Sequence, residues 1–202
     1  MENVKIFEAK NVKIFDRELN LIQDGLLRDI TRDYLENATP DYFWTDGASS
    51  SGKYHPKFSQ GTGGLVRHTK SVVMFAEELL RMTPYDTLDD VFKDYVIIAC
   101  IVHDTQKYGI GEFNKKEYKY HAQNAAIAFH GFAYEEYDYI VSDTLTHAIV
   151  SHMGQWSAPE DRPISLVDNC VHLADYIASR KFIDIPELSY DYWLNIEELP
   201  FD

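Results

Sequence analysis

The sequence is short of cysteine and lacks any long apolar run. Its two cysteines, Cys100 and Cys170, are far apart and each lies in an apolar stretch, which favours reduced, buried thiols over a disulfide framework or a cysteine-type zinc site. Lys5, Glu8 and Lys10 interrupt the N-terminal stretch, so it lacks the apolar core of a signal peptide, and no later run approaches the length of a membrane span. We therefore expect a soluble, cytoplasmic protein that does not act at a membrane.

Positive charge is also scarce. The 202 residues include 19 lysines and arginines against 33 aspartates and glutamates, which gives a formal net charge of -14 at pH 7. Binding along a nucleic-acid backbone needs clustered basic side chains that neutralise phosphates. Long nucleic acid is therefore not expected as a partner, whereas small phosphate-bearing substrates, or strand ends that reach a local basic pocket, stay open.

The apolar residues that are present repeat with the period of helices. Within the stretch 16–36, Leu19, Ile22 and Leu26 follow helical spacing with charged residues between them. No stretch alternates as a strand does, so the sequence predicts an all-α fold, and its length predicts a single domain over 1–202. The predicted segments are helices at 16–36, 64–82, 88–107, 118–131, 134–153 and 164–182, an ordered loop at 41–63, and an acidic, aromatic tail at 185–202.

Six of the eight histidines lie in apolar helical contexts, where an unpaired imidazole is costly to bury. They are His68, His103, His121, His147, His152 and His172. A lone buried histidine is more often a hydrogen-bonded core residue than a ligand, but here several are spread over five helices, together with the adjacent pair His103-Asp104 and with Asp175. Helical bundles build metal sites from ligands on facing helices. The pattern therefore predicts a metal site inside the bundle.

Three motifs carry a family resemblance. GGLVRHT at 63–69, IVHDTQK at 101–107 and LADY at 173–176 resemble, in this order, the first-histidine, histidine-aspartate and terminal-aspartate motifs of the HD-domain metal-dependent phosphohydrolases. The resemblance covers about 50–182. It implies an all-α protein with a single HD-type helical bundle as its core.

The resemblance also implies two sets of metal ligands. The first set is complete in this sequence and consists of His68, His103, Asp104 and Asp175. A second ion would take ligands from His121 and His152, because YHAQNA and HAIVSHMG look like the intermediate histidines of members that hold two metals. The run from Ser151 to Lys181 is most similar to HD domains of the bacterial 3′-5′ exoribonuclease type. Met153 stands where those relatives have a second histidine, and Ala178 where they often have a second aspartate.

The chemistry of these ligands suits a divalent metal cofactor. Imidazole and carboxylate donors with open positions fit Mn²⁺, Fe²⁺, Co²⁺, Ni²⁺ or Zn²⁺, as one or two ions. Asp104 is the expected catalytic ligand nearest the attacking water, and Lys107, on nearly the same helix face, is expected to neutralise phosphate charge. The alternative for Lys107 is an ordinary lysine at a helix C-terminus. Substrate contacts are expected from Lys53, His55, Arg67 and His147.

Several functions stay open at this point. The first hypothesis is hydrolysis of a phosphoester bond in a nucleotide or short oligonucleotide by metal-activated water, with a 3′-5′ exoribonuclease-like activity as the runner-up. The second is a metal-containing domain that binds a nucleotide for regulation without turnover, and the third is a purely structural helical protein. A homo-oligomer also stays open. The aromatic residues that could stack a base, with core packing as the alternative, are Phe43, Trp44, Tyr54 and Trp156.

Overall fold

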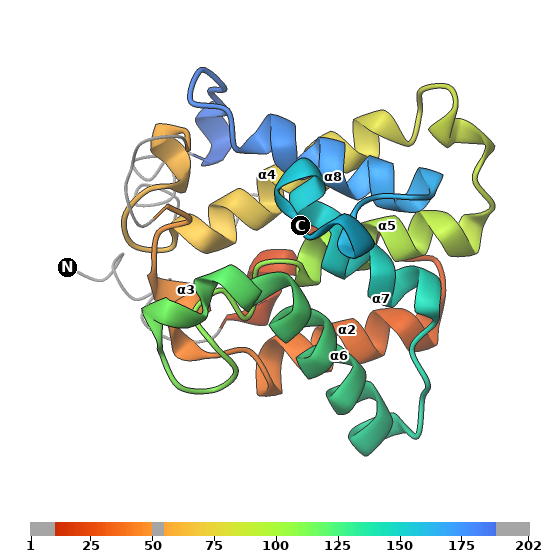
Figure 1. Cartoon of the computed structure of the whole chain (residues 1–202), viewed down its shortest axis with the longest axis horizontal. Helices are drawn as coiled ribbons and strands as arrows, with labels where there is room; N and C mark the ends of the chain where they lie inside the picture. The colour runs from red at the N-terminus through yellow and green to blue at the C-terminus, as the bar shows by residue number, and fades with distance from the viewer. Residues whose placement is uncertain (1–10, 50–54, 189–202) are drawn as a thin grey trace.

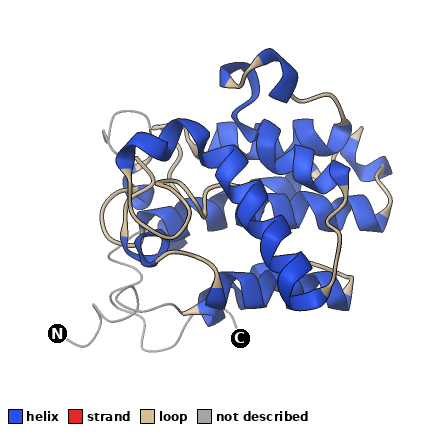
Figure 2. Ribbon diagram, turned by 60° about the horizontal axis from the view of Figure 1, so that its bottom comes forward, coloured by secondary structure: helices blue, strands red, loops and turns tan. Residues whose placement is uncertain are grey.

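The computed structural model describes residues 11–49 and 55–188. Within these ranges the chain forms helices and loops and no strand (Figure 2), which confirms the all-α prediction. The α-helices are α1 (Asp16–Leu19), α2 (Gly25–Asn37), α3 (Asp41–Thr45), α4 (Gly64–Leu79), α5 (Asp90–Val102), α6 (His121–Tyr137), α7 (Asp143–Val150) and α8 (Leu166–Ala178). Lys53 and most of the predicted tail at 185–202 lie outside the described residues. Among the described helices, none has both the length and the apolar character that crossing a membrane requires.

Helix α5 is the centre of the bundle. Its residues from Val96 to Val102 are all buried, because the segment VIIACIV is apolar on every side. Helices α4, α7 and α8 pack against α5, and α4 lies alongside α8 (Figure 1). Helix α2 packs against α6, where the ring of Tyr34 meets the ring of Phe129 edge-on at a centroid distance of 5.1 Å. The elements that carry the three motifs at 63–69, 101–107 and 173–176 therefore share one core.

The predicted helix at 16–36 is wrong in one respect, because the structure divides it into α1 and α2. In the turn between the two helices, the amides of Gln23 and Asp24 each donate to the buried carboxylate of Asp94 at 2.8 Å. The Asp24 side chain accepts an amide from the first turn of α2 at 3.0 Å and caps that helix. A carboxylate that is distant in sequence thus satisfies the amides of the turn and stabilises the break.

Other helices also differ from the predictions at their ends, and the helix predicted at 134–153 is the shorter α7, which begins at Asp143 and ends at Val150. The helix predicted at 118–131 continues as α6 to Tyr137, where Asp138 adopts a left-handed conformation (φ 50°) and ends it. Helix α5 ends at Val102, before its predicted end, and His103 is its C-cap. The early end of α5 determines how the residues after it reach the site.

Both cysteines are free and buried, as the sequence predicts. Cys100 lies on α5 and Cys170 on α8, and burial raises the pKa of the Cys170 thiol to about 12. The two thiols are therefore protonated at neutral pH and pack as small apolar groups between the helices.

Candidate metal centre

The histidine-aspartate pair lies where α5 ends. His103 is the C-cap of the helix, and its Nδ1 hydrogen-bonds the carbonyl of Cys100 at 2.8 Å. Asp104 follows in a turn, and its side chain is only 3% exposed. Consecutive residues inside a helix point about 100° apart. Because the helix ends here, both side chains reach the same buried region.

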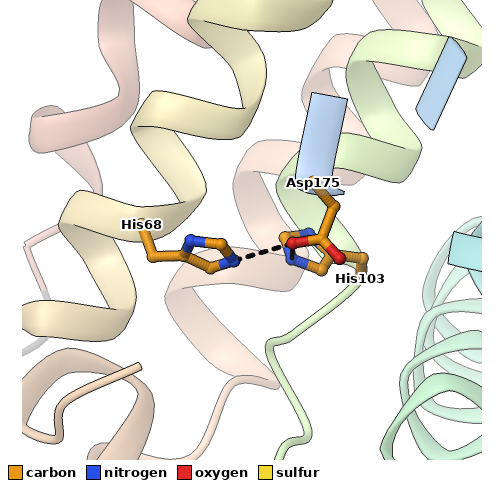
Figure 3. Close-up of side chains that lie close together, drawn as sticks. All are labelled: His68, His103 and Asp175. Atoms are coloured by element: carbon orange, nitrogen blue, oxygen red, sulfur yellow. Dashed lines mark ion pairs between the residues drawn. The ribbon is translucent and has the colours of Figure 1, made fainter. Parts of the chain in front are cut away.

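Three side chains from separate elements form one group of potential ligands. His68 comes from α4, His103 from the end of α5 and Asp175 from α8, and Figure 3 shows them converging. His68 Nε2 lies 3.0 Å from Asp175 Oδ1, and His103 Nε2 lies 3.9 Å from the same oxygen. Donor atoms that each lie about 2.0–2.2 Å from one ion are separated by roughly 3–4 Å. The spacing therefore fits a single metal ion.

Asp104 connects this group to a second one. Its Oδ2 lies 3.8 Å from Nε2 of both His68 and His103, and its Oδ1 lies 3.4 Å from Nε2 of His121. Lys107 Nζ lies 2.5 Å from Oδ2. Burial alone raises the pKa of the Asp104 carboxyl, but Lys107 and the surrounding imidazoles hold it well below its ordinary value. Asp104 is therefore ionised at neutral pH and lies between the two groups.

His121 and His152 face each other in the second group. Their Nε2 atoms lie 3.0 Å apart, while their Nδ1 atoms hydrogen-bond the carbonyls of Tyr118 at 2.6 Å and Ile149 at 2.8 Å. A carbonyl only accepts, so each Nδ1 carries the proton and each Nε2 presents a lone pair. Neither Nε2 can donate to the other, and two lone pairs at this distance repel unless a cation lies close to both.

The whole donor set fits a divalent metal ion. His103 has the same arrangement, because its Nδ1 bonds a carbonyl while its buried Nε2 has no hydrogen-bond partner among the described residues. Oδ1 of Asp104 is also buried and has no hydrogen-bond partner among the described residues. A carbonyl that holds the proton on Nδ1 and leaves Nε2 to the metal is typical of histidine ligands. A bound ion would satisfy polar atoms whose burial otherwise costs free energy.

The protonation states also favour metal binding. Burial lowers the pKa of His152 to about 3, and burial likewise lowers the pKa of His103 and of His121. Burial would raise the pKa of the Asp175 carboxyl, but its hydrogen bond with His68 and the nearby imidazoles lower it. At neutral pH the imidazoles of His103, His121 and His152 are therefore neutral and the Asp175 carboxylate is ionised, and these are the forms that bind metals.

The structure brings together every residue that the sequence predicts as a metal ligand, and we call this histidine–aspartate set the HD centre. Its members are His68, His103, Asp104, His121, His152 and Asp175. Lys107 joins the set through its ion pair with Asp104. Ala178 is fully buried in α8 and offers no donor. That these six side chains bind metal remains a prediction.

His55 packs against the edge of the centre. The centroid of its ring lies 5.2 Å from that of His68, and its buried Nδ1 has no hydrogen-bond partner within the described ranges. Burial, together with the nearby His68, lowers the pKa of His55 to about 3. A neutral imidazole at this position is available to contact a substrate. Lys53, which the sequence predicts in the same role, lies outside the described residues.

Arg67 precedes His68 on α4 and bonds the backbone of a nearby loop, and its role in substrate binding remains a prediction. The side chain is fully buried, and its guanidinium donates to three backbone carbonyls, those of Phe58, Gln60 at 2.9 Å and Thr62 at 2.8 Å. These carbonyls belong to the loop that precedes α4. Arg67 therefore holds this loop against the helix that carries the first histidine, and its donors are directed at the backbone.

His147 pairs with a residue outside the centre, and its contact with substrate remains a prediction. Its Nδ1 lies 3.0 Å from Oδ2 of Asp168, whose side chain belongs to the capping box of α8. Asp168 precedes Asp175 by seven residues on the same helix, which corresponds to about 10 Å along the axis. His147 lies on α7, whereas His152 lies in the next element, so the two rings do not share a face.

The comparison with known families agrees with this geometry. The family model of the HD domain matches residues 65–180, more than half of the chain. The matched region contains all six residues of the centre. The chain belongs to the HD-domain family. No curated protein and no solved structure matches it. HD domains bind divalent metals, and the family broadly comprises metal-dependent phosphohydrolases.

Two residues near Asp175, Tyr176 and Arg180, were not expected from the sequence to belong to the site. Tyr176 directly follows Asp175, and its ring stacks on that of Trp156 at a centroid distance of 5.9 Å and an interplanar angle of 14°. The Arg180 guanidinium carbon lies 4.1 Å from the Tyr176 centroid. The only sequence signal was the spacing of Tyr176 and Arg180, which are four residues apart on one helix face. The other candidates for base stacking are in the core or outside the described residues: Phe43, Trp44 and Tyr54.

Proposed function

We propose that this HD-domain protein is a hydrolase that cleaves a phosphoester bond of a nucleotide or short oligonucleotide. The observation that carries the proposal is the set of unprotonated Nε2 atoms of His103, His121 and His152, which surround the carboxylate of Asp104 in a buried centre. A purely structural ion pair does not need three imidazoles whose lone pairs converge. The family supports the reaction class, because HD domains are broadly metal-dependent phosphohydrolases.

The six residues of the HD centre would hold one or two ions. The first set is His68, His103, Asp104 and Asp175, and the second is Asp104, His121 and His152. Mixed nitrogen and oxygen donors suit Mn²⁺, Fe²⁺, Co²⁺, Ni²⁺ or Zn²⁺. When bound, such an ion supplies Lewis-acid polarisation of the phosphoryl group and activates water. Asp104 Oδ1, unpartnered among the described residues, can accept a hydrogen bond from the attacking water and orient it.

Lys107 provides positive charge next to Asp104. Burial would lower the pKa of its ammonium group, but the ion pair with Asp104 raises it above the ordinary value, so the group is charged. A phosphoryl group gains negative charge on its oxygens in the transition state, and a fixed ammonium stabilises that charge. The reading of Lys107 as an ordinary helix-end lysine does not explain why the ammonium pairs with the central carboxylate of the site.

The stack beside Asp175 supports a nucleotide as the substrate. Trp156 is 56% exposed, and only one face of its ring is covered by Tyr176. A planar base can extend this stack on the open face, since stacking on aromatic rings needs no particular base sequence. Arg180 contacts the Tyr176 ring and holds that end of the stack in place. Tyr176 directly follows Asp175 on α8, so the stack is carried by the same helix as one ligand of the HD centre.

The test is product analysis by chromatography on the purified full-length chain. The substrates are ribo- and deoxynucleoside mono-, di- and triphosphates, cyclic nucleotides and a short single-stranded RNA, each with Mn²⁺, Fe²⁺, Co²⁺ or Ni²⁺. Asp104→Ala removes the central carboxylate, and His147→Ala is the matched control because His147 lies outside the centre. We expect metal-dependent product with the parent chain and with His147→Ala, and none with Asp104→Ala.

Two results would lead to other functions. Nucleotide-dependent thermal stabilisation without product would favour a domain that binds a nucleotide for regulation. Absence of metal from the purified chain, together with an unfolding temperature that does not respond to chelator, would favour a structural role for the histidines. In either case the proposed hydrolase activity would be abandoned.

A further inference from the structure

The segment that leads into His121 is exposed and rich in lysine and aromatic residues. It consists of Phe113, Asn114 and the 3₁₀-helix η5 (Lys115–Tyr120), and we call it the basic–aromatic segment. It is attached to the HD centre, because the Nδ1 of His121 hydrogen-bonds the carbonyl of Tyr118 at 2.6 Å. The segment therefore lies at the edge of the proposed site and follows any movement of one of its ligands.

The three lysines of this segment give it a local positive charge in an acidic protein. Within the described ranges, Lys115, Lys116 and Lys119 form no ion pair, although the chain has 33 acidic residues and a net charge of -14. The cations that do pair with carboxylates elsewhere are Arg17, Arg32, Lys70, Arg81, Lys93 and Lys107. The segment next to His121 therefore carries a local group of three lysines that pair with no carboxylate within the described ranges.

The aromatic rings of the segment are also exposed. The exposed fractions are 48% for Phe113, 58% for Tyr118 and 49% for Tyr120. Lys115 Nζ lies 5.8 Å from the centroid of Phe113, and Lys119 Nζ lies 4.6 Å from the centroid of Tyr120. Lysines that alternate with open rings offer phosphate contacts and stacking surfaces side by side, which is the combination that single-stranded nucleic acid needs.

We infer that the basic–aromatic segment binds the backbone and bases of a short single-stranded oligonucleotide whose terminal phosphoester lies at the HD centre. This inference rests on the proposed function and narrows its substrate class. The HD centre and Lys107 would bind the phosphates of a mononucleotide, which leaves the three lysines of η5 without a role. A 3₁₀-helix rises about 2 Å per residue, so Lys115 and Lys119 are separated by about 8 Å and can meet more than one phosphate. The acidic remainder of the chain repels a long strand and limits the bound length.

The first test measures binding without requiring turnover. Fluorescence anisotropy follows a labelled single-stranded RNA of about 12 nucleotides as it binds the full chain at several salt concentrations, in chelator so that the strand stays intact. Each phosphate contact contributes about -0.7 to the slope of log K against log salt for single strands. The triple substitution Lys115→Gln, Lys116→Gln and Lys119→Gln should therefore reduce the slope by about 2 and weaken binding by roughly 10- to 100-fold at about 0.1 M salt.

The matched control removes the same charge from other faces of the molecule. Its substitutions are Lys13→Gln, Arg81→Gln and Lys93→Gln, and it should keep the salt slope and the affinity of the parent. If both triple variants lose affinity equally, or if the parent does not bind the strand, the inference is overturned. If the η5 triple variant binds a nucleoside triphosphate more weakly by the same factor as the strand, the lysines contact a single nucleotide, and the inference also fails.

Two more measurements separate this inference from the proposed function. Metal-dependent hydrolysis of a small aryl phosphodiester should be the same in the parent and in the η5 triple variant, because the small ester does not reach the segment. If the parent does not hydrolyse the small ester, this result counts against the proposed function. The binding measurement then decides the inference by itself. Tyr118→Leu should weaken strand binding by about 5- to 150-fold, whereas Tyr118→Phe, which keeps the ring, should not. Equal binding by these two variants would exclude stacking.

Discussion

Gly154 lies directly against the imidazole of His172. A Cβ atom at position 154 would come within 2.1 Å of His172 Cε1 and 2.4 Å of both ring nitrogens, and Gly154 has a φ of 59° that favours glycine. The same imidazole bonds the backbone carbonyl of His152 through Nδ1 at 2.8 Å. The space above Gly154 therefore helps to set the position of the 3₁₀-helix η6 (Ser151–Trp156), which carries His152.

We expect Gly154→Ala to reduce the metal content of the purified protein without abolishing it. The new methyl group must displace His172, so the bond that holds His152 is lost while the other ligand set is unchanged. Metal per chain is measured by elemental analysis after dialysis against Mn²⁺. Gly131→Ala in α6 is the control, because its Cβ would meet no atom within 4 Å; it should keep the metal and gain about 0.5–1 kcal/mol of stability. Equal metal content in the two variants would contradict this role for Gly154.

Removal of metal should lower the unfolding temperature of the parent. A ligand present at about 100 times its dissociation constant adds roughly 2.7 kcal/mol to the free energy of unfolding. For a chain of this size this raises the unfolding temperature by about 5–10 °C. His121→Ala should lose part of that metal-dependent shift, because His121 contributes only to the second group. His147→Ala should retain the whole shift. A parent chain whose unfolding temperature is the same in Mn²⁺ and in chelator would rule out the metal centre.

Lys107→Gln should lower kcat by about 10²–10³-fold while the bound metal is retained. The ammonium stabilises charge that develops during the reaction, and no donor atom of Lys107 is needed to hold the ion. Lys107→Arg keeps the charge and should recover part of the rate. Lys93→Gln makes the same change of charge on α5, away from the centre, and should leave kcat unchanged. A rise in KM alone for Lys107→Gln would mean that the lysine binds the ground state only.

The stability of the metal-free protein should decrease as pH falls from about 7 to about 5. The pKa values of His55 and His152 are both lowered to about 3 in the folded chain, against the ordinary 6.5. The unfolded chain therefore takes up protons below pH 6.5 while the folded chain does not. Each of these histidines lowers the free energy of unfolding by up to about 1.4 kcal/mol for each pH unit of acidification. Urea unfolding in chelator at several pH values measures this slope. His152→Gln should reduce it, and a flat profile in the parent would show that these imidazoles are not buried in their neutral form.

The HD centre was predictable from the sequence because its ligands are spread over several helical segments, each with a local apolar pattern. His68 and His121 are buried on their helices and Asp175 is half-buried on α8, and the order of the motifs along the chain indicated which of them meet. The pair at the end of α5 was also recognisable, since a polar His-Asp pair after an unbroken apolar run has few structural explanations. Helix period located these segments, and the resemblance of their motifs to the HD-domain family indicated the ligand set.

The features that the sequence could not predict depend on contacts between distant residues. The break between α1 and α2 exists because Asp94, on α5, accepts two amides of the intervening turn. The stack of Trp156 on Tyr176 depends on how η6 folds back over α8. Arg67 stands next to His68 in the sequence, but adjacent helical positions point about 100° apart, and its guanidinium donates to the backbone of the preceding loop.

Arg67 provides the clearest test of that difference between sequence and structure. If it bound a substrate phosphate, Arg67→Ala would raise KM and leave stability unchanged. Because its guanidinium instead donates to three carbonyls of the loop before α4, we expect Arg67→Ala to lower the free energy of unfolding by about 3 kcal/mol. Arg67→Lys should restore little, since a single ammonium cannot span three carbonyls that the planar guanidinium reaches. Urea unfolding, together with KM of the folded fraction at low temperature, separates the two roles, and a change in KM alone would return Arg67 to the substrate site.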